Sequence, residues 1–144
     1  MTTCVLDASV ALKWFVPEVE SEQARLLFRQ RMRGDLSIHV PDHFFAEMGN
    51  ILWKKVRSKE LRRRDVPDIV RAIRAIPDEA YLSSDLLPGA LDLAHEVKET
   101  VYDGLYLALA VALHCELVTA DRRLWTRISS GNFRRYVRWV GNIE

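Results

Sequence analysis

The sequence predicts an α/β fold in which helices cover both faces of a central, mainly parallel sheet of about five strands. Short β-prone runs alternate with amphipathic helical segments along the chain, as in parallel sheets. No repeat, linker or low-complexity segment interrupts this alternation. The 144 residues, 49% of them hydrophobic, are enough to build one core without disulfides or a structural metal. We therefore expect a single domain over residues 1–144.

In the first half of the chain, strands are predicted at residues 3–6 and 38–40. Helices are predicted at residues 8–15, 21–34, 42–56 and 65–76. Pro17 is expected to stop the first helix, because proline cannot continue one. Ser21 is expected to cap the second helix, and Gly34 to end it.

The second half of the chain continues the pattern. Strands are predicted at residues 80–82, 117–120 and 136–140, and helices at 86–97 and 103–113. The helix at 103–113 is apolar almost all round, which indicates that it is buried. In a parallel sheet covered on both faces, ligands bind beyond the carboxyl ends of the strands.

Composition excludes several classes of protein. The 21 basic and 20 acidic residues give a net charge of +1, so the total charge predicts no polyanionic partner. The longest apolar stretch, residues 105–113, is far shorter than the roughly 18 residues of a membrane span. The start of the chain lacks a signal-peptide pattern, and the two cysteines have no Cys-x-x-Cys spacing. We expect a cytoplasmic protein that does not associate with membranes.

Two acidic residues follow predicted strands directly. Asp7 comes after the strand at 3–6, and Asp121 after the strand at 117–120. Because parallel strands place their carboxyl ends at one edge of a sheet, residues 114 positions apart in the sequence are expected to become neighbours. Aspartate also caps helices well, so each of these residues could serve only as a helix cap.

Two further acids have unusual settings. Glu47 lies about 40° from Ile51 on a helical wheel, at the border of an apolar stripe. Asp103 opens the most apolar predicted helix of the chain, so that helix is expected to begin inside the protein. The alternatives are that Glu47 reaches out to water and that Asp103 is a helix cap.

A divalent cation would explain why these four acids gather. Carboxylates brought together raise one another's pKa values and destabilise the fold, and a cation removes that repulsion. Mg²⁺ suits oxygen ligands and substrate phosphates, and Mn²⁺ could substitute for it. The four histidines are scattered in the sequence, which disfavours zinc.

At this point the sequence resembles the PIN-domain family and, within it, the VapC-type toxins of bacterial and archaeal toxin–antitoxin pairs. Four segments carry the resemblance in matching order and spacing over nearly the whole chain: residues 5–9 (VLDAS), 45–50 (FAEMGN), 102–110 (YDGLYLALA) and 117–121 (LVTAD). The resemblance implies a PIN-like three-layer α/β/α fold.

The resemblance also implies roles for individual residues. Four acids look like the family's catalytic and metal-binding residues: Asp7, Glu47, Asp103 and Asp121. Ser9 and Thr119 look like the hydroxyls that support those carboxylates; a helix cap and an ordinary strand-end side chain are their alternatives. Some family members carry another Asp or Asn a few residues beyond the fourth acid, where this chain has Leu124 and Trp125.

By the same resemblance, the chain is expected to be a Mg²⁺-dependent endoribonuclease that cleaves single-stranded RNA as the toxin of a type II toxin–antitoxin system. VapC-like proteins usually form homodimers and are neutralised by a small antitoxin whose basic tail enters the acidic groove. The residues alone favour hydrolysis of a phosphodiester bond, because metal-bound carboxylates suit that reaction and Ser9 has no recognisable histidine partner.

Basic residues indicate a nucleic-acid substrate. Residues 54–64 hold seven positive charges against Glu60 alone, and no acid lies between Arg122 and Ile143. We single out Lys54, Arg122 and Arg123 as candidate RNA contacts; a solvated helix surface is the alternative. Two other functions stay open: a non-catalytic nucleic-acid-binding or regulatory module, and a nuclease for DNA ends or flaps.

Overall fold

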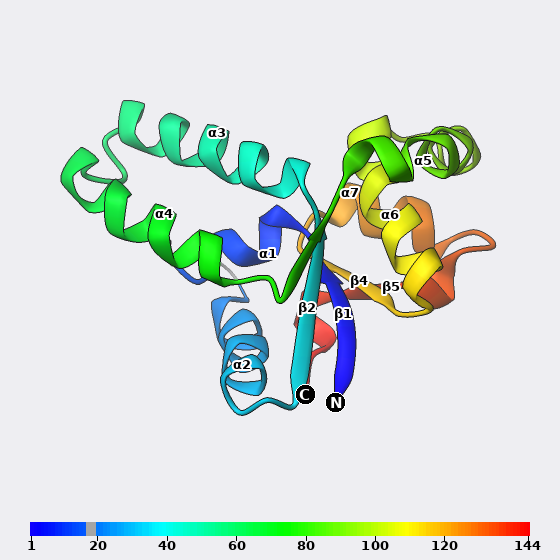
Figure 1. Cartoon of the computed structure of the whole chain (residues 1–144), viewed down its shortest axis with the longest axis horizontal. Coiled ribbons are helices and arrows are strands. Elements are labelled where there is room, and N and C mark those ends of the chain that lie inside the picture. The colour runs from blue at the N-terminus through cyan, green and yellow to red at the C-terminus, as the bar shows by residue number, and fades with distance from the viewer. Residues whose placement is uncertain (17–19) are drawn as a thin grey trace.

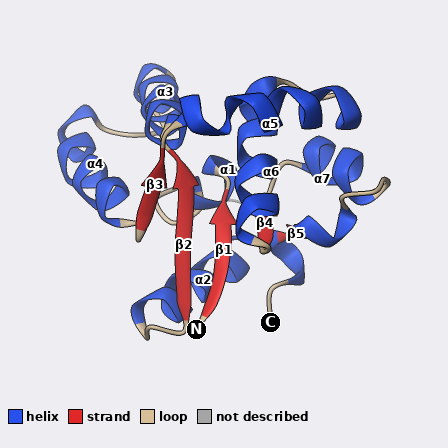
Figure 2. Ribbon diagram, turned by 45° about the vertical axis from the view of Figure 1, so that its right-hand side comes forward, coloured by secondary structure: helices blue, strands red, loops and turns tan. Residues whose placement is uncertain are grey.

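The computed structural model describes residues 1–16 and 20–144 and contains a five-stranded sheet. Its strands are β1 (Thr2–Leu6), β2 (Leu36–Pro41), β3 (Glu79–Tyr81), β4 (Glu116–Thr119) and β5 (Val137–Trp139). They lie in the order β3-β2-β1-β4-β5, and every neighbouring pair is parallel. The predicted α/β class and the five parallel strands are confirmed. Figure 2 shows helices beside the strands of this sheet.

The helices of the described part are α1 (Ala8–Leu12), α2 (Ser21–Met32), α3 (His43–Arg57), α4 (Val66–Ala75), α5 (Ser83–Val97), α6 (Val101–Leu113) and α7 (Arg122–Ser129). Three 3₁₀ turns complete them: η1 (Arg63–Asp65), η2 (Arg134–Tyr136) and η3 (Val140–Asn142). Figure 1 shows α3 and α4 as a helical hairpin that projects from one side of the sheet.

Helices cover both faces of the sheet centre. Val5 and Leu6 are consecutive in β1, so their side chains point to opposite faces, yet both are fully buried. Helix α6 packs on β1, β2 and β4, with α5 against its outer side, while α2 packs on β2 and α7 on β4 and β5. No helix in the described ranges is long and apolar enough to span a bilayer.

The boundaries of α1 and α5 differ from the predictions. Helix α1 ends at Leu12 instead of residue 15, because residues 13–15 form a turn with hydrogen bonds of the i to i−3 type. Helix α5 begins at Ser83, three residues early, and accommodates Pro88 in its interior. The predicted stop at Pro17 lies outside the described residues.

Two predicted caps are also wrong. Ser21 is the buried first residue of α2, and the N-cap position is Glu20, which has a left-handed backbone. Helix α6 begins at Val101, and its cap is Thr100, so Asp103 lies within the first turn instead of preceding the helix.

The contact between α5 and α6 requires Gly104. A Cβ atom at this position would collide with the backbone carbonyl oxygen of Ala90 and lie 3.2 Å from the Cβ of Ala94. Only glycine lets the two helices approach this closely. The residue therefore fixes the first turn of α6, where Asp103 lies.

The strand order reverses at β1. The chain runs from β1 through β2 to β3 on one side and then returns to β4 and β5 on the other. In open α/β sheets such a reversal leaves a crevice at the carboxyl ends of the two strands involved. The carboxyl ends of β1 and β4 are followed by Asp7 and by Ala120–Asp121, respectively.

Candidate active site

Asp7 extends the ladder between β1 and β4 and is nearly buried, with 6% of its surface exposed. Its backbone N–H donates to the carbonyl oxygen of Val118 over 3.1 Å. Its side-chain Oδ2 accepts hydrogen bonds from Thr119 Oγ1 at 2.7 Å and Ser9 Oγ at 2.9 Å. The Asp7 carboxyl group is thus held in one orientation by two hydroxyls.

These hydroxyls also bind the end of β4. Ser9 Oγ accepts the backbone N–H of Ala120 at 3.0 Å, and Thr119 Oγ1 accepts that of Asp121 at 3.0 Å. A hydroxyl that accepts from a backbone N–H keeps its own proton free, and here that proton points to Asp7. Ser9 and Thr119 therefore join Asp7 to the segment that carries Asp121.

Asp121 caps helix α7, which is the alternative role that the sequence indicated for this residue. Its Oδ1 accepts the backbone N–H groups of Arg123 at 3.0 Å and Leu124 at 3.2 Å. The capping bonds involve one carboxylate oxygen, so Oδ2 remains for a ligand. Capping thus fixes the Asp121 side chain without consuming its capacity to bind a cation.

Asp103 is the third residue of α6 and exchanges hydrogen bonds with the capping residue. Thr100 Oγ1 accepts the Asp103 N–H at 3.3 Å and donates to Asp103 Oδ2 at 3.4 Å. This reciprocal arrangement resembles a capping box. The alternative that Asp103 itself is the cap is wrong.

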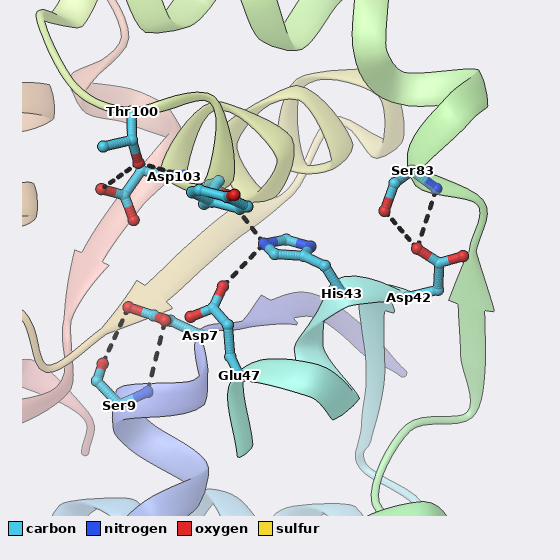
Figure 3. Close-up of polar contacts among 9 residues, drawn as sticks. Asp7, Ser9, Asp42, His43, Glu47, Ser83, Thr100 and Asp103 are labelled. Carbon is cyan, nitrogen blue, oxygen red and sulfur yellow. Dashed lines mark hydrogen bonds and ion pairs between the residues drawn. The ribbon is translucent and has the colours of Figure 1, made fainter. Parts of the chain in front are cut away.

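Glu47 reaches the site from the second turn of α3. Its Oε1 lies 2.9 Å from the Nε2 atom of His43, one turn earlier on the same helix face. That oxygen is buried and receives no well-directed hydrogen bond from any described residue. Figure 3 shows the carboxyl groups of Asp7, Glu47 and Asp103 facing one common space.

Burial and mutual repulsion raise two of the carboxyl pKa values. Burial is the main cause that raises the pKa of Asp7 to about 6, and the negative charge of Glu47 adds to it. Hydrogen bonds from Thr119 and Ser9 lower this pKa and offset part of the increase. Burial, followed by repulsion from Asp7, Glu99, Asp121 and Glu47, raises the pKa of Asp103 to about 7. The other three predicted acids are therefore all close enough to affect the charge of Asp103.

The carboxylates of Asp7, Glu47 and Asp103 face one space without forming a closed metal site. Within residues 1–16 and 20–144, no three carboxylate, imidazole or thiolate groups converge closely enough to hold one cation. Their chemistry nevertheless fits a hard dication, since the facing donors are oxygens and the buried Glu47 Oε1 lacks a donor. Side-chain rotations would be needed to complete a metal site.

The candidate RNA contacts lie in different surroundings. Lys54 is exposed on α3, two turns or about 10 Å beyond Glu47. The Arg122 guanidinium lies over Trp139, 4.0 Å from the ring centroid, directly beside Asp121. Arg123 lies 3.3 Å from the nearly buried carboxylate of Glu99, so part of its charge is already neutralised.

Sequence reasoning missed three residues around the acids. Tyr106 is fully buried, its hydroxyl makes no well-directed hydrogen bond with a described residue, and the negative charges of Asp7 and Glu47 add to burial in raising its pKa. His43 contacts Glu47, and the negative charge of Glu99 contributes to raising the pKa of Asp103. Helical spacing could have indicated His43 and Tyr106, four residues before Glu47 and three after Asp103. No sequence signal indicated Glu99.

Comparison with known proteins identifies the family of this chain. The sequence profile of the PIN domain matches residues 4–129. The chain belongs to the PIN-domain family. The match includes all four acids, from the end of β1 to the start of α7.

Curated relatives within this PIN-domain family carry VapC names, as the resemblance in the sequence implied. Ribonuclease VapC3 of Pyrobaculum aerophilum is 33% identical over 124 residues, which cover 83% of this chain and 90% of that protein. Ribonuclease VapC1 of Mycobacterium tuberculosis is 31% identical over 125 residues, which cover 86% of this chain and 90% of that protein.

A solved structure shares the fold. A crystal structure of another Pyrobaculum aerophilum protein superimposes with a TM-score of 0.68 and covers 96% of this chain and 84% of that one. The two sequences are 21% identical, so this likeness concerns the fold alone. It supports the PIN-like arrangement of helices around the parallel sheet.

Proposed function

We propose that this PIN-domain protein is a Mg²⁺-dependent endoribonuclease that hydrolyses phosphodiester bonds of single-stranded RNA as the toxin of a type II toxin–antitoxin system. The observation that carries the proposal is the perturbed acidic cluster. Burial and repulsion raise the pKa values of Asp7 and Asp103 to about 6 and 7, which destabilises the metal-free charged state. Perturbed acids at the crevice of an α/β sheet are typical of a functional site.

The cation is proposed from the donor set. Asp7, Asp103 and Asp121 would hold it, and Glu47 would either join them or orient the attacking water. When bound, Mg²⁺ neutralises charge on a phosphate oxygen and lowers the pKa of water to supply a nucleophile. Mn²⁺ is proposed as a substitute, because it accepts the same ligands and geometry.

The protein's own residues supply orientation. Ser9 and Thr119 donate their hydroxyl protons to Asp7 Oδ2, and the Ser9 backbone N–H donates to Asp7 Oδ1 over 3.4 Å as Asp7 caps α1, so both carboxylate oxygens are held in place. The cap of α7 fixes Asp121, and Thr100 restrains Asp103. Such hydrogen bonds orient metal-binding carboxylates before the substrate arrives.

Arg122 supports an RNA substrate better than the other basic candidates. Its guanidinium is stacked on Trp139 beside Asp121, where it could meet a phosphate next to the scissile bond. Lys54 and Arg123 would contact the RNA farther along the strand, and Arg123 would first exchange its contact with Glu99. The relatives named as ribonucleases favour RNA over DNA.

Partners are proposed on the same basis. The proposed partners are a second copy of the chain and an antitoxin whose basic tail enters the acidic crevice. Large apolar side chains exposed on or directly before several helices suit such interfaces: Phe28, Met32, Trp53, Leu82, Leu87 and Leu91. We further propose that residues 1–144 act as one nuclease domain in the cytoplasm.

Cleavage assays test the function. Purified protein is incubated with single-stranded RNA, single-stranded DNA or branched DNA, with Mg²⁺ or with EDTA. We expect cleavage of RNA only, its loss in EDTA, and a roughly thousand-fold lower rate in Asp7→Asn, because each 1.4 kcal/mol of lost charge stabilisation costs a factor of ten. Asp92→Asn, an exposed acid on α5, is the matched control and should stay active.

The same assay separates the other functions. Metal-independent cleavage, or full activity in Asp7→Asn, would overturn the proposed chemistry. RNA binding without cleavage that survives loss of the acids would indicate a non-catalytic module. Preference for branched DNA would indicate a DNA end or flap nuclease.

A further inference from the structure

His43 contacts two parts of the acidic site at once. It is the first residue of α3, and its Nε2 atom lies 2.9 Å from Glu47 Oε1 and 3.0 Å from the backbone carbonyl oxygen of Tyr102. Tyr102 directly precedes Asp103 in α6. One imidazole nitrogen therefore stands between the helix that carries Glu47 and the turn that carries Asp103 (Figure 3).

The hydrogen-bond roles follow from the acceptors. A carbonyl oxygen and a carboxylate oxygen only accept, so Nε2 carries the proton that both can attract. The bond to Tyr102 has good geometry, whereas Glu47 Oε1 has no well-directed donor among the described residues. His43 thus keeps this Glu47 oxygen close while leaving it able to accept another ligand.

Packing prevents the imidazole ring from turning away. The ring centroid lies 4.6 Å from that of Tyr106 and 6.2 Å from that of Tyr102, and only 12% of the His43 side chain is exposed. Tyr106 is fully buried against the core, so it acts as a fixed wall behind the imidazole. A side chain held in this way can impose a position on its neighbour.

We propose that His43 is a positioning residue of the acidic site: its shared Nε2–H sets Glu47 against the first turn of α6 and so fixes the separation of Glu47 from Asp103. The role rests on the proposed function, because that separation matters only if the carboxylates act together on a dication. His43 needs no contact with substrate for this role, since it acts through Glu47.

Two substitutions distinguish the effect of the His43 Nε2–H donor from the effect of its ring packing. His43→Phe keeps an aromatic ring for packing and removes the N–H, while His43→Gln restores an N–H near the position of Nε2. Binding of Mn²⁺ is measured by calorimetry without RNA, and thermal unfolding is recorded for each variant. We expect His43→Phe to bind Mn²⁺ 10- to 100-fold more weakly, as is usual for losing the partner of a metal ligand, and His43→Gln to recover most of the affinity.

A double-mutant cycle tests whether His43 acts through Glu47. If it does, His43→Phe combined with Glu47→Gln binds Mn²⁺ no more weakly than Glu47→Gln alone. The matched control is His95→Phe, an exposed histidine on α5, which should not change Mn²⁺ affinity.

Each outcome decides between the two proposals. If the native protein binds Mn²⁺ and His43→Phe binds it equally well, the positioning role is wrong and the proposed function stands. The role is also wrong if His43→Phe and His43→Gln lose the same affinity, or if the effects of His43→Phe and Glu47→Gln add. If the native protein binds no Mn²⁺, the proposed function fails and the positioning role fails with it.

Discussion

The acidic site has two halves that are built in different ways. Asp7 and Asp121 follow neighbouring strands and are held by hydrogen bonds that bridge β1 and β4. Glu47 and Asp103 lie on α3 and α6, and the contacts of His43 join these helices across the site. We call the first pair the strand half and the second pair the helix half.

The two halves differ in what fixes the carboxylates. In the strand half, backbone pairing and two hydroxyls determine the position of Asp7, which is almost fully buried. In the helix half, the positions depend on how α3, α5 and α6 pack, and both carboxylates are partly exposed. The strand half is therefore positioned mainly by hydrogen bonds between adjacent strand ends, and the helix half mainly by helix packing and the contacts of His43.

The largest effect is expected from pH acting on Asp7. The folded protein holds this proton up to about pH 6, whereas an unfolded aspartate loses it near pH 4, so stability falls as the pH rises through this window. For Asp7 the loss is roughly 3 kcal/mol in the absence of metal. The raised pKa of Asp103 extends the decline to about pH 7.

Urea unfolding of metal-free protein between pH 4 and 8 measures this decline. Asp7→Asn should remove the part of the decline that is due to Asp7, leave a part due to Asp103, and be the more stable protein at pH 8, while Asp92→Asn should follow the native curve. A stability that rises from pH 4 to 7 would contradict the burial of an acid in the strand half.

Thr119→Val tests the hydrogen bonding of the strand half. The change keeps the shape but removes the hydroxyl that donates to Asp7 and accepts from Asp121. We expect RNA cleavage to fall 10- to 100-fold, as for other lost partners of metal ligands. Unchanged cleavage rates would mean that the hydroxyl does not orient Asp7 for the reaction.

Gly104→Ala tests the dependence of the helix half on packing. The added methyl group collides with the Ala90 carbonyl, so α5 and α6 must separate, at a cost of about 1–3 kcal/mol. Gly89→Ala is the control, because it lies in α5 with free space around it and should stabilise the protein slightly. Equal stability of the two variants in thermal unfolding would show that this contact does not hold α6.

The smallest effect is expected from Thr100→Val. Removing the cap of α6 should lower the free energy of unfolding by about 1 kcal/mol. RNA cleavage should fall less than in Thr119→Val, because Asp103 keeps its place in the helix. A larger loss of cleavage than in Thr119→Val would reverse the proposed difference between the halves.

The strand half could be predicted from the sequence more directly than the helix half. The positions of Asp7 and Asp121 follow from a general rule of parallel sheets, which brings the ends of β1 and β4 together whatever the helices do. Helical periodicity placed Glu47 at the border of an apolar stripe, and the structure puts it beside His43. The expected repulsion between carboxylates linked all four acids to one dication, and the family resemblance then implied their roles.

The features that the sequence did not predict depend on tertiary contacts. Thr100 lies three residues before Asp103, and the choice of cap between them depends on where α6 meets α5. The packing of His43 on Tyr106 joins residues 63 positions apart on different helices, which no local pattern encodes. Helix ends such as Leu12 are set by turn hydrogen bonds that propensities do not resolve.

The central claim is that the two halves form one acidic pocket that favours a dication. Its most direct test is titration of the carboxyl ¹³C signals of Asp7 and Asp103 by NMR, without and with Mg²⁺. The metal-free protein should show midpoints near pH 6 and 7, and Mg²⁺ should lower both. Midpoints near pH 4 that ignore Mg²⁺ would contradict the claim.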